Sequence, residues 1–409
     1  MMLTFFVAMA LCNVDATVTF QLELDEIIEL PCKDCDGVAV GDINNNGKID
    51  ILASSGDYGK VFWFEQGDTY TDWRKRPIYA MPAFSGEFEG NDLADFDDDG
   101  LLEAVSLDQP NGNILLHKQQ QLDEDLWDTV VIQPNRPYVQ ASLITDYTGD
   151  GTLDMIYTWE GLAPGEGGVH LLQFTGEDVR NPEHWTDHVL MQHESAWWLA
   201  RERHDWTGNG NETDIVYTAR HLLRRNEGAR PGLFLLEVDG DGDLSPTCHI
   251  IDDTLPHPLH VDFGDISGAG NGKDLAVGGF DTNILYWYAY ADAWERHEIP
   301  LPEVNDVAPY RIWNVKTIPL PGNRDALLAP ITDSQRGALV CFEFHDGEFH
   351  PNVLKLLDYR HPIDDRIILH DLSGNGIPEA IMPDSGVDAD RQGINRLLVV
   401  SFKIAEPRS

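Results

Sequence analysis

Short strand-like runs alternate with polar turns along nearly the whole chain. The first group of four contains "GVAVGDI" (37–43), "DILASSG" (50–56), "KVFWFEQ" (60–66) and "WRKRPIYA" (73–80). Runs rich in β-branched and aromatic residues, bounded by Gly, Asn, Asp or Pro, are typical of β-strands. No stretch repeats apolar residues at helical spacing over the length that a helix needs. The pattern therefore predicts an all-β chain built from groups of four strands.

A polar loop separates the first two strands of each group. In "GDINNNGKID" (41–50), side-chain oxygens stand at loop positions 1, 3, 5 and 9 and a glycine at position 6. Alternating oxygen donors around a glycine turn can enclose Ca²⁺, although a plain solvated turn has a similar composition. The expected metal ligands of the recurring loop are Asp42, Asn44, Asn46 and Asp50; Asp95, Asp97, Asp99 and Glu103; Asp146, Thr148, Asp150 and Asp154; Asp205, Thr207, Asn209 and Asp214; and Asp371, Ser373, Asn375 and Glu379.

The loops differ in the donors that they offer. With four carboxylates, the Asp95–Glu103 loop is expected to bind Ca²⁺ most tightly, because affinity rises with ligand charge. The Asp265–Asp274 copy has Ala269 in place of its third donor, so we expect it to be the weakest or empty. The sequence thus predicts several structural calcium ions.

The loops recur at a nearly constant interval. Successive leading aspartates at 42, 95, 146, 205 and 265 are 53, 51, 59 and 60 residues apart. The next one, Asp371, follows after two such steps, and a decayed copy with Gly322 and Asp325 lies in the gap. Such a period indicates a repeat architecture, and four-stranded sheets repeated radially form a β-propeller. We predict seven four-stranded blades, the last closed by the N-terminal strand "TVTFQLELDEI" (17–27).

The recurring D-x-[DN]-x-[DN]-G-x-x-[DE] loop resembles the FG-GAP or VCBS-type repeat of the integrin α-subunit propeller and of many secreted microbial proteins. The resemblance extends over roughly residues 17–403. It implies the propeller fold and bound Ca²⁺. It leaves the function open, because one fold hosts many unrelated activities.

The N-terminal residues 1–16 resemble a secretory signal, with an apolar core and the small residues Val14 and Ala16 before a cleavage site. We therefore expect one propeller domain over 17–409 in a secreted or periplasmic protein. Beyond the signal, the cysteines are Cys32, Cys35, Cys248 and Cys341. "CKDC" (32–35) predicts a local disulfide before the first blade. A redox role is the alternative, but that motif belongs near a βαβ pattern.

The formal net charge is −42. Five bound calcium ions would add ten positive charges and leave −32, so metal binding accounts for only part of it. Such a surface disfavours nucleic acid and anionic membranes as partners. No segment after the signal is long enough to insert in a membrane. Carbohydrate or protein remains as the expected ligand.

One face of the predicted ring should collect the loops that precede each first strand and follow each second strand. These loops surround the central channel, opposite the cation loops. Aromatic rings can stack on sugars while charged groups bond their hydroxyls, although exposed loops are polar in any propeller. The expected ligand-binding residues are Tyr138, Trp159, Trp197, Arg220, Arg311, Asp364 and Arg366.

Two functions remain open. The first is a binding propeller. The second is a sugar lyase or dehydratase, in which a base removes a proton beside a carbonyl and a cation stabilises the enolate; aldos-2-ulose dehydratases carry related repeats. Its catalytic candidates are His257, His260, His221 and Glu194. The first two could also hold a transition metal, or be ordinary surface histidines. No nucleophile elbow, phosphate-cradling loop or dinucleotide fingerprint occurs, and we favour the binding hypothesis.

Overall fold

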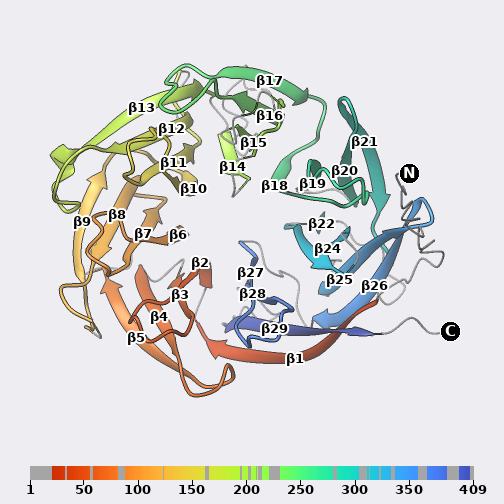
Figure 1. The fold of residues 1–409 in the computed structure, drawn as a ribbon, viewed down its shortest axis with the longest axis horizontal. Helices are drawn as coiled ribbons and strands as arrows, with labels where there is room; N and C mark the ends of the chain where they lie inside the picture. The colour runs from red at the N-terminus through yellow and green to blue at the C-terminus, as the bar shows by residue number, and fades with distance from the viewer. Residues whose placement is uncertain are drawn as a thin grey trace, which may run out of the picture.

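The structure is a computed structural model in which the strands form a ring of small sheets around a central channel (Figure 1). It describes residues 21–32, 35–55, 59–81, 88–122, 124–161, 165–193, 196–200, 204–208, 210, 214–220, 231–279, 283–303, 311–312, 314–321, 324–332, 337–357, 366–384 and 396–405.

Each blade is an antiparallel sheet, and in blades 1 to 6 the four strands follow one another in sequence from the channel outwards. Blades 1 to 3 contain β2 (Cys35–Gly41), β3 (Asp50–Ser55), β4 (Lys60–Gln66), β5 (Trp73–Ala80), β6 (Phe88–Ala94), β7 (Glu103–Asp108), β8 (Asn113–Lys118), β9 (Asp128–Gln133), β10 (Val139–Thr145), β11 (Asp154–Trp159), β12 (Gly168–Phe174) and β13 (Trp185–Gln192). A short 3-10 helix, η1 (Pro182–His184), precedes β13.

Blades 4 to 6 repeat this order. They contain β14 (Ala196–Leu199), β15 (Ile215–Ala219), β16 (Gly232–Glu237), β17 (Thr247–Asp252), β18 (Pro258–Gly264), β19 (Asp274–Gly279), β20 (Ile284–Tyr290), β21 (Trp294–Pro300), β23 (Lys316–Leu320), β24 (Arg324–Thr332), β25 (Gly337–His345) and β26 (Glu348–Leu357). The two-residue strand β22 (Arg311–Ile312) pairs with both β19 and β24 and so joins blades 5 and 6 into one continuous sheet.

The last blade is completed by the N-terminal strand, as the sequence predicts. Its sheet has the order β1-β29-β28-β27, in which β1 is Gln21–Pro31, β27 Ile368–His370, β28 Glu379–Asp384 and β29 Arg396–Ala405. The long β1 runs beside β29 in Figure 1. A disulfide between Cys32 and Cys35 follows β1 and marks the start of blade 1. The all-β, seven-bladed fold with an N-terminal closing strand is therefore confirmed.

Apolar side chains fill the space between neighbouring blades. The second strands are the most enclosed, and every residue of β3, β7, β11, β19 and β28 is buried. Hydroxyl groups on second strands add contacts between blades: Thr158 donates to the Trp197 carbonyl and Thr218 to the Leu259 carbonyl. These contacts fix the channel ends of the strands, where candidate site residues lie.

Candidate functional site

The cation loops have a common geometry that depends on the leading aspartate. In blade 1, Asp42 accepts hydrogen bonds from the backbone N–H groups of Asn46 (2.9 Å) and Gly47 (2.8 Å). Asp371 makes the same two contacts in blade 7, to Asn375 and Gly376. Position 6 requires glycine because its φ is 82° at Gly47, a left-handed conformation that other residues adopt only with strain.

The acid that ends each cation loop stands at position 9, or at position 10 in the longer loops of blades 4 and 5, and it is buried in blades 1 to 5 and 7. Asp50 accepts hydrogen bonds from the N–H groups of Ile43 (3.0 Å) and Gln66 (2.9 Å), so it connects the loop to the end of the third strand. Burial raises the pKa of Asp50 to about 7, although these two hydrogen bonds oppose the shift. Asp154, Asp214 and Asp274 bond the corresponding N–H groups in their blades.

Three loops contain a ligand-position oxygen that lacks a hydrogen-bond partner. Among the described residues, these buried atoms are Asn44 Oδ1 in blade 1, Asp205 Oδ1 in blade 4 and Ser373 Oγ in blade 7. An unsatisfied buried oxygen is costly, and hard cations such as Ca²⁺ are bound by such oxygens. The donor sets of these three loops therefore fit the ion that the sequence predicts.

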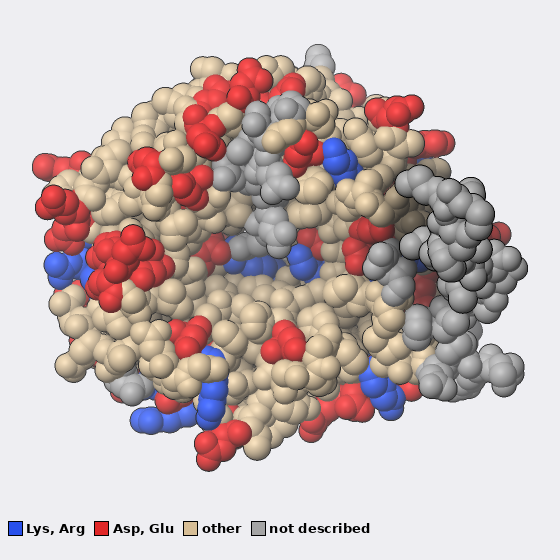
Figure 2. Space-filling view, in the orientation of Figure 1, with Lys and Arg blue, Asp and Glu red and all other residues tan. Residues whose placement is uncertain are grey.

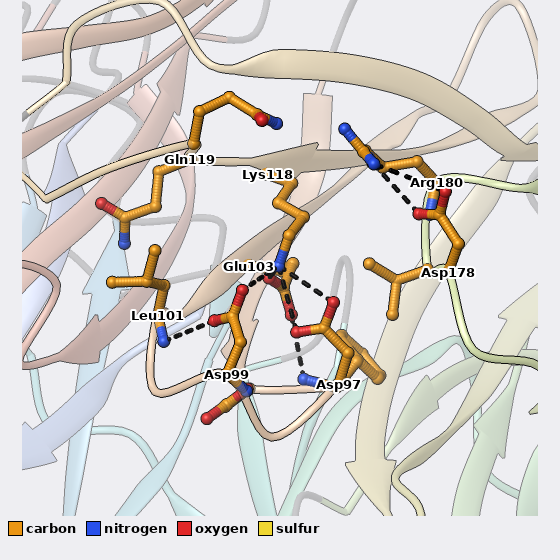
Figure 3. A network of polar contacts seen from close by, with 12 residues as sticks. Asp97, Asp99, Leu101, Glu103, Lys118, Gln119, Asp178 and Arg180 are labelled. Atoms are coloured by element: carbon orange, nitrogen blue, oxygen red, sulfur yellow. Dashed lines mark hydrogen bonds and ion pairs between the residues drawn. The ribbon is translucent and has the colours of Figure 1, made fainter.

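The loop of blade 2 is different because a lysine reaches its acidic side chains (Figure 3). Lys118 Nζ lies 2.7 Å from both Asp99 and Glu103 and 3.0 Å from Asp97. The same loop holds a compact acidic group, since carboxylate oxygens of Asp95, Asp97 and Asp99 lie within 4.8 Å of one another. No other group of three His, Cys, Asp or Glu side chains has its ligand atoms this close together in the part of the chain that the structure describes.

The threonines at the third position of two loops are satisfied internally. Thr148 and Thr207 donate their hydroxyls to the aspartates that end their own loops, Asp154 and Asp214. Asn209 lies outside the described residues. In the decayed loop of blade 6, Asp325 is used to join two blades: its carboxylate accepts from Asp265 N–H at 2.7 Å.

At the opposite end of the channel, a basic and aromatic cluster contains several predicted ligand-binding residues. The Arg220 guanidinium lies 3.4 Å from the centroid of the Trp197 ring, and both side chains are buried. Burial lowers the pKa of Arg220 to about 9, opposed by the charges of Glu160 and Glu89. In the adjacent strands, the His260 ring packs against Trp198 with centroids 4.0 Å apart. The structure thus brings Trp197 and Arg220 into contact, and it places His260 beside Trp198 of the neighbouring blade.

Other predicted residues lie apart from this cluster. Trp159 packs inside blade 3, where its indole N–H donates to His170 Nε2. Tyr138 is half-buried in a turn with a φ of 62°. His257 is exposed although His260, three residues later, is buried. His221, Glu194 and Asp364 lie outside the described residues, as does the side chain of Arg311.

Arg366 lies within the channel, where it joins three blades. Its Nη1 donates to the carbonyl of Val38 in blade 1 and to Asp92 in blade 2, at 3.2 and 2.9 Å. Its Nε and Nη2 have no hydrogen-bond partner among the described residues. A second ion pair, Lys316–Asp262 at 2.8 Å, joins blades 6 and 5. Both pairs line a cavity of about 550 Å³ near the cation-loop ends of the first strands.

Sequence reasoning missed Asp92, Asp262 and Lys316 as channel residues. Charged residues within otherwise apolar first strands were the available signal. Basic side chains gather in the hollow at the middle of the face shown in Figure 2, whereas acidic side chains are spread around it.

Comparison with known proteins supports the repeat and the fold. Residues 42–106 match the FG-GAP-like repeat. Among solved structures, BBS1N in complex with ARL6DN aligns with a TM-score of 0.51 at 10% identity, covering 95% of this chain and 98% of that chain. The WD40 domain of Toxoplasma gondii coronin has a TM-score of 0.51 at 12% identity, with 96% and 89% covered.

A lectin from Agrocybe aegerita that recognises non-reducing terminal N-acetylglucosamine aligns with a TM-score of 0.49 at 13% identity, with 92% and 86% covered. No curated protein matches the sequence. At these identities the structural likeness shows the fold alone.

Proposed function

Starting from a seven-bladed propeller with an FG-GAP-like repeat, we propose a secreted, calcium-stabilised protein that binds a carbohydrate on the channel face opposite the cation loops. A protein is the alternative ligand. The observation that carries the ligand proposal is the contact between Trp197 and Arg220 at that end of the channel, with the charge of Glu160 nearby. The Cys32–Cys35 disulfide supports an oxidising compartment.

The calcium proposal rests on the unsatisfied ligand oxygens. In blade 1, Asp42, Asn44 and Asn46 would hold the ion, and in blade 7 Asp371, Ser373 and Asn375. The ion would neutralise the leading aspartate and satisfy Asn44 Oδ1 or Ser373 Oγ, which lack protein partners. An ion that binds only the folded state raises stability by mass action.

The ligand proposal follows from the strand order. Trp197 lies near the start of a first strand, whereas Glu160 and Arg220 each come directly after a second strand. These strand ends meet on one face of the ring, so three chemically different groups converge there. Arginine and glutamate can bond sugar hydroxyls in fixed directions, and tryptophan offers an apolar face.

A sugar lyase or dehydratase is the second candidate, and the buried His260 beside Trp198 is the observation that favours it. A general base contributes about 10²–10⁴-fold to rate. If His260 is that base, His260→Ala should remove turnover to that extent without unfolding the protein. Ultraviolet absorbance of an unsaturated product, measured on a panel of neutral and oxidised sugars, distinguishes catalysis from binding.

The binding proposal is tested by a glycan array followed by titration calorimetry on the best ligand. Arg220→Gln should weaken binding at least tenfold because it removes a charged donor from the cluster. Arg136→Gln is the matched control, since Arg136 also lies near a tryptophan ring but bonds Tyr157 and Asp187 within blade 3. Equal affinities of the two variants, or no ligand on the array, would refute a carbohydrate function.

Partners of other classes are disfavoured by charge. Acidic side chains are distributed over much of the face in Figure 2, and a net charge of −42 repels nucleic acid and anionic membranes. Within the described residues, no helix has both the length and the apolar character needed to cross a membrane.

A further inference from the structure

We propose that the Lys118 ammonium is the resident cation of the blade 2 loop, so that this loop does not bind calcium in the native protein. The inference concerns the most acidic of the repeated loops and rests on the calcium role proposed for the others. It reverses the expectation from sequence that four carboxylates make this loop the tightest calcium site.

Lys118 lies among the side chains that would bind a metal in this loop. Its Nζ contacts Asp97, Asp99 and Glu103, which occupy loop positions 3, 5 and 9 (Figure 3). These are three of the four side chains expected to bind the ion. A calcium ion needs its oxygen ligands at about 2.3–2.6 Å, so the ion and the ammonium cannot share the same three carboxylates. One cation excludes the other.

Burial keeps the Lys118 side chain inside the loop. Lys118 is 8% exposed and Glu103 is fully buried. The Lys118 ammonium has three carboxylates of the loop as ion-pair partners, at 2.7 to 3.0 Å. A further cation, Arg180, lies near Asp97 and bonds Asp178.

No lysine or arginine occupies the equivalent position in five other blades. Register pairs Ala104 with His117 in blade 2, and Ile51 with Phe64 in blade 1. Lys118 therefore corresponds to Glu65, the next residue after Phe64. By the same register, the residues equivalent to Lys118 in blades 3, 4, 5 and 7 are Gln173, Glu237, Ala289 and Ser401.

The hydrogen bonding of the side-chain oxygen at loop position 3 agrees with this assignment. In blades 1 and 7, Asn44 and Ser373 each retain a buried oxygen without a hydrogen-bond partner, whereas Asp97 in blade 2 accepts from Lys118. The blade 2 loop is also placed to support its neighbour, because the Asn45 side chain donates to the Gly100 carbonyl at 2.6 Å. A loop that holds its shape without calcium would therefore adjoin one that depends on calcium.

Calcium stoichiometry tests the proposal, measured by titration calorimetry on the full chain after chelation and desalting. Asp97→Asn should leave the number of bound ions unchanged from wild type, because blade 2 contributes none. Lys118→Met, purified in calcium, should bind one additional ion, and Lys118→Met with Asp97→Asn should lose it again. Lys403→Met is the control: this lysine also faces two carboxylates, at 3.7 and 3.9 Å, but lies outside the cation loops.

The outcomes separate this inference from the proposed function. If Asp97→Asn binds one calcium ion fewer than wild type, the proposed role of Lys118 is wrong. It is also wrong if Lys118→Met binds no additional ion. If Lys118→Met does not fold, the Asp97→Asn comparison still decides. If wild type binds no calcium at all while Lys118→Met binds one ion, the calcium proposal for the other loops fails and the role of Lys118 stands.

Discussion

Acidification should destabilise the propeller through one buried histidine, His117, in the third strand of blade 2. This side chain is fully buried, with Nε2 2.9 Å from Ser106 Oγ and Nδ1 2.8 Å from Thr129 Oγ1. Neither hydroxyl can neutralise an imidazolium. Burial accordingly lowers the pKa of His117 to about 3.

The sign and size of the effect follow from the two states. In the unfolded chain the imidazole has a pKa of about 6.5 and takes up a proton that the folded protein does not. The unfolded state therefore binds more protons between pH 6.5 and pH 3, and stability falls as the pH is lowered through this window. Each pH unit corresponds to about 1.4 kcal/mol, so His117 should cost about 2 kcal/mol of unfolding free energy between pH 7 and pH 5.

Urea unfolding at pH 7 and pH 5, with calcium in excess, measures this loss. Other groups also titrate, so the informative quantity is the difference between wild type and His117→Gln, whose pH dependence should be smaller by about 2 kcal/mol. His249→Gln is the control, because the His249 side chain is 46% exposed. If wild type and His117→Gln lose the same stability between the two pH values, the argument from burial is wrong.

Three further outcomes are expected. Deleting residues 21–31 removes β1, so the unpaired edge of β29 should cause aggregation that light scattering detects; a monomeric deletion variant would contradict the closing role of β1. Replacing Cys32 and Cys35 by serine should lower unfolding free energy by about 2 kcal/mol, the value for a loop this short, with an unchanged urea midpoint as the contrary result. Thr158→Val should cost about 1 kcal/mol in the same assay, because it removes the hydrogen bond to the Trp197 carbonyl.

The fold could be predicted because its signals repeat. A loop such as Asp42–Asp50 is weak evidence by itself, but its recurrence in register fixes both the blade period and the first two strands of a blade. The incomplete last group then required an outer strand, and β1 supplies it. The β22 bridge between blades 5 and 6 could not be predicted, since two residues within a long connection carry no periodic signal.

The candidate site could be predicted only in part. The strand order places Trp197, Arg220 and His260 at the expected end of the channel. The strand order could not show that Trp159 packs inside its blade against His170, because this depends on the face of the second strand from which the indole ring projects. The role of Lys118 was equally hidden: it lies 15 residues after Glu103, and only the register of the third strand brings the two together.

The charges along the channel connect blades that are not neighbours in sequence. Arg366 crosses from blade 7 to Asp92 in blade 2 and also bonds the Val38 carbonyl of the intervening blade 1. Its charge is buried, and loss of a buried partner leaves an uncompensated ion that is strongly destabilising. The ring is therefore closed in two places: near its central axis by the contacts of Arg366, and at its outer edge, where β1 pairs with β29.

Because Arg366 Nη1 already holds these contacts, a ligand that approached Arg366 would have to use Nε and Nη2. The assignment of Arg366 to ligand binding thus stays a prediction, and the cluster around Arg220 is the better place to test it.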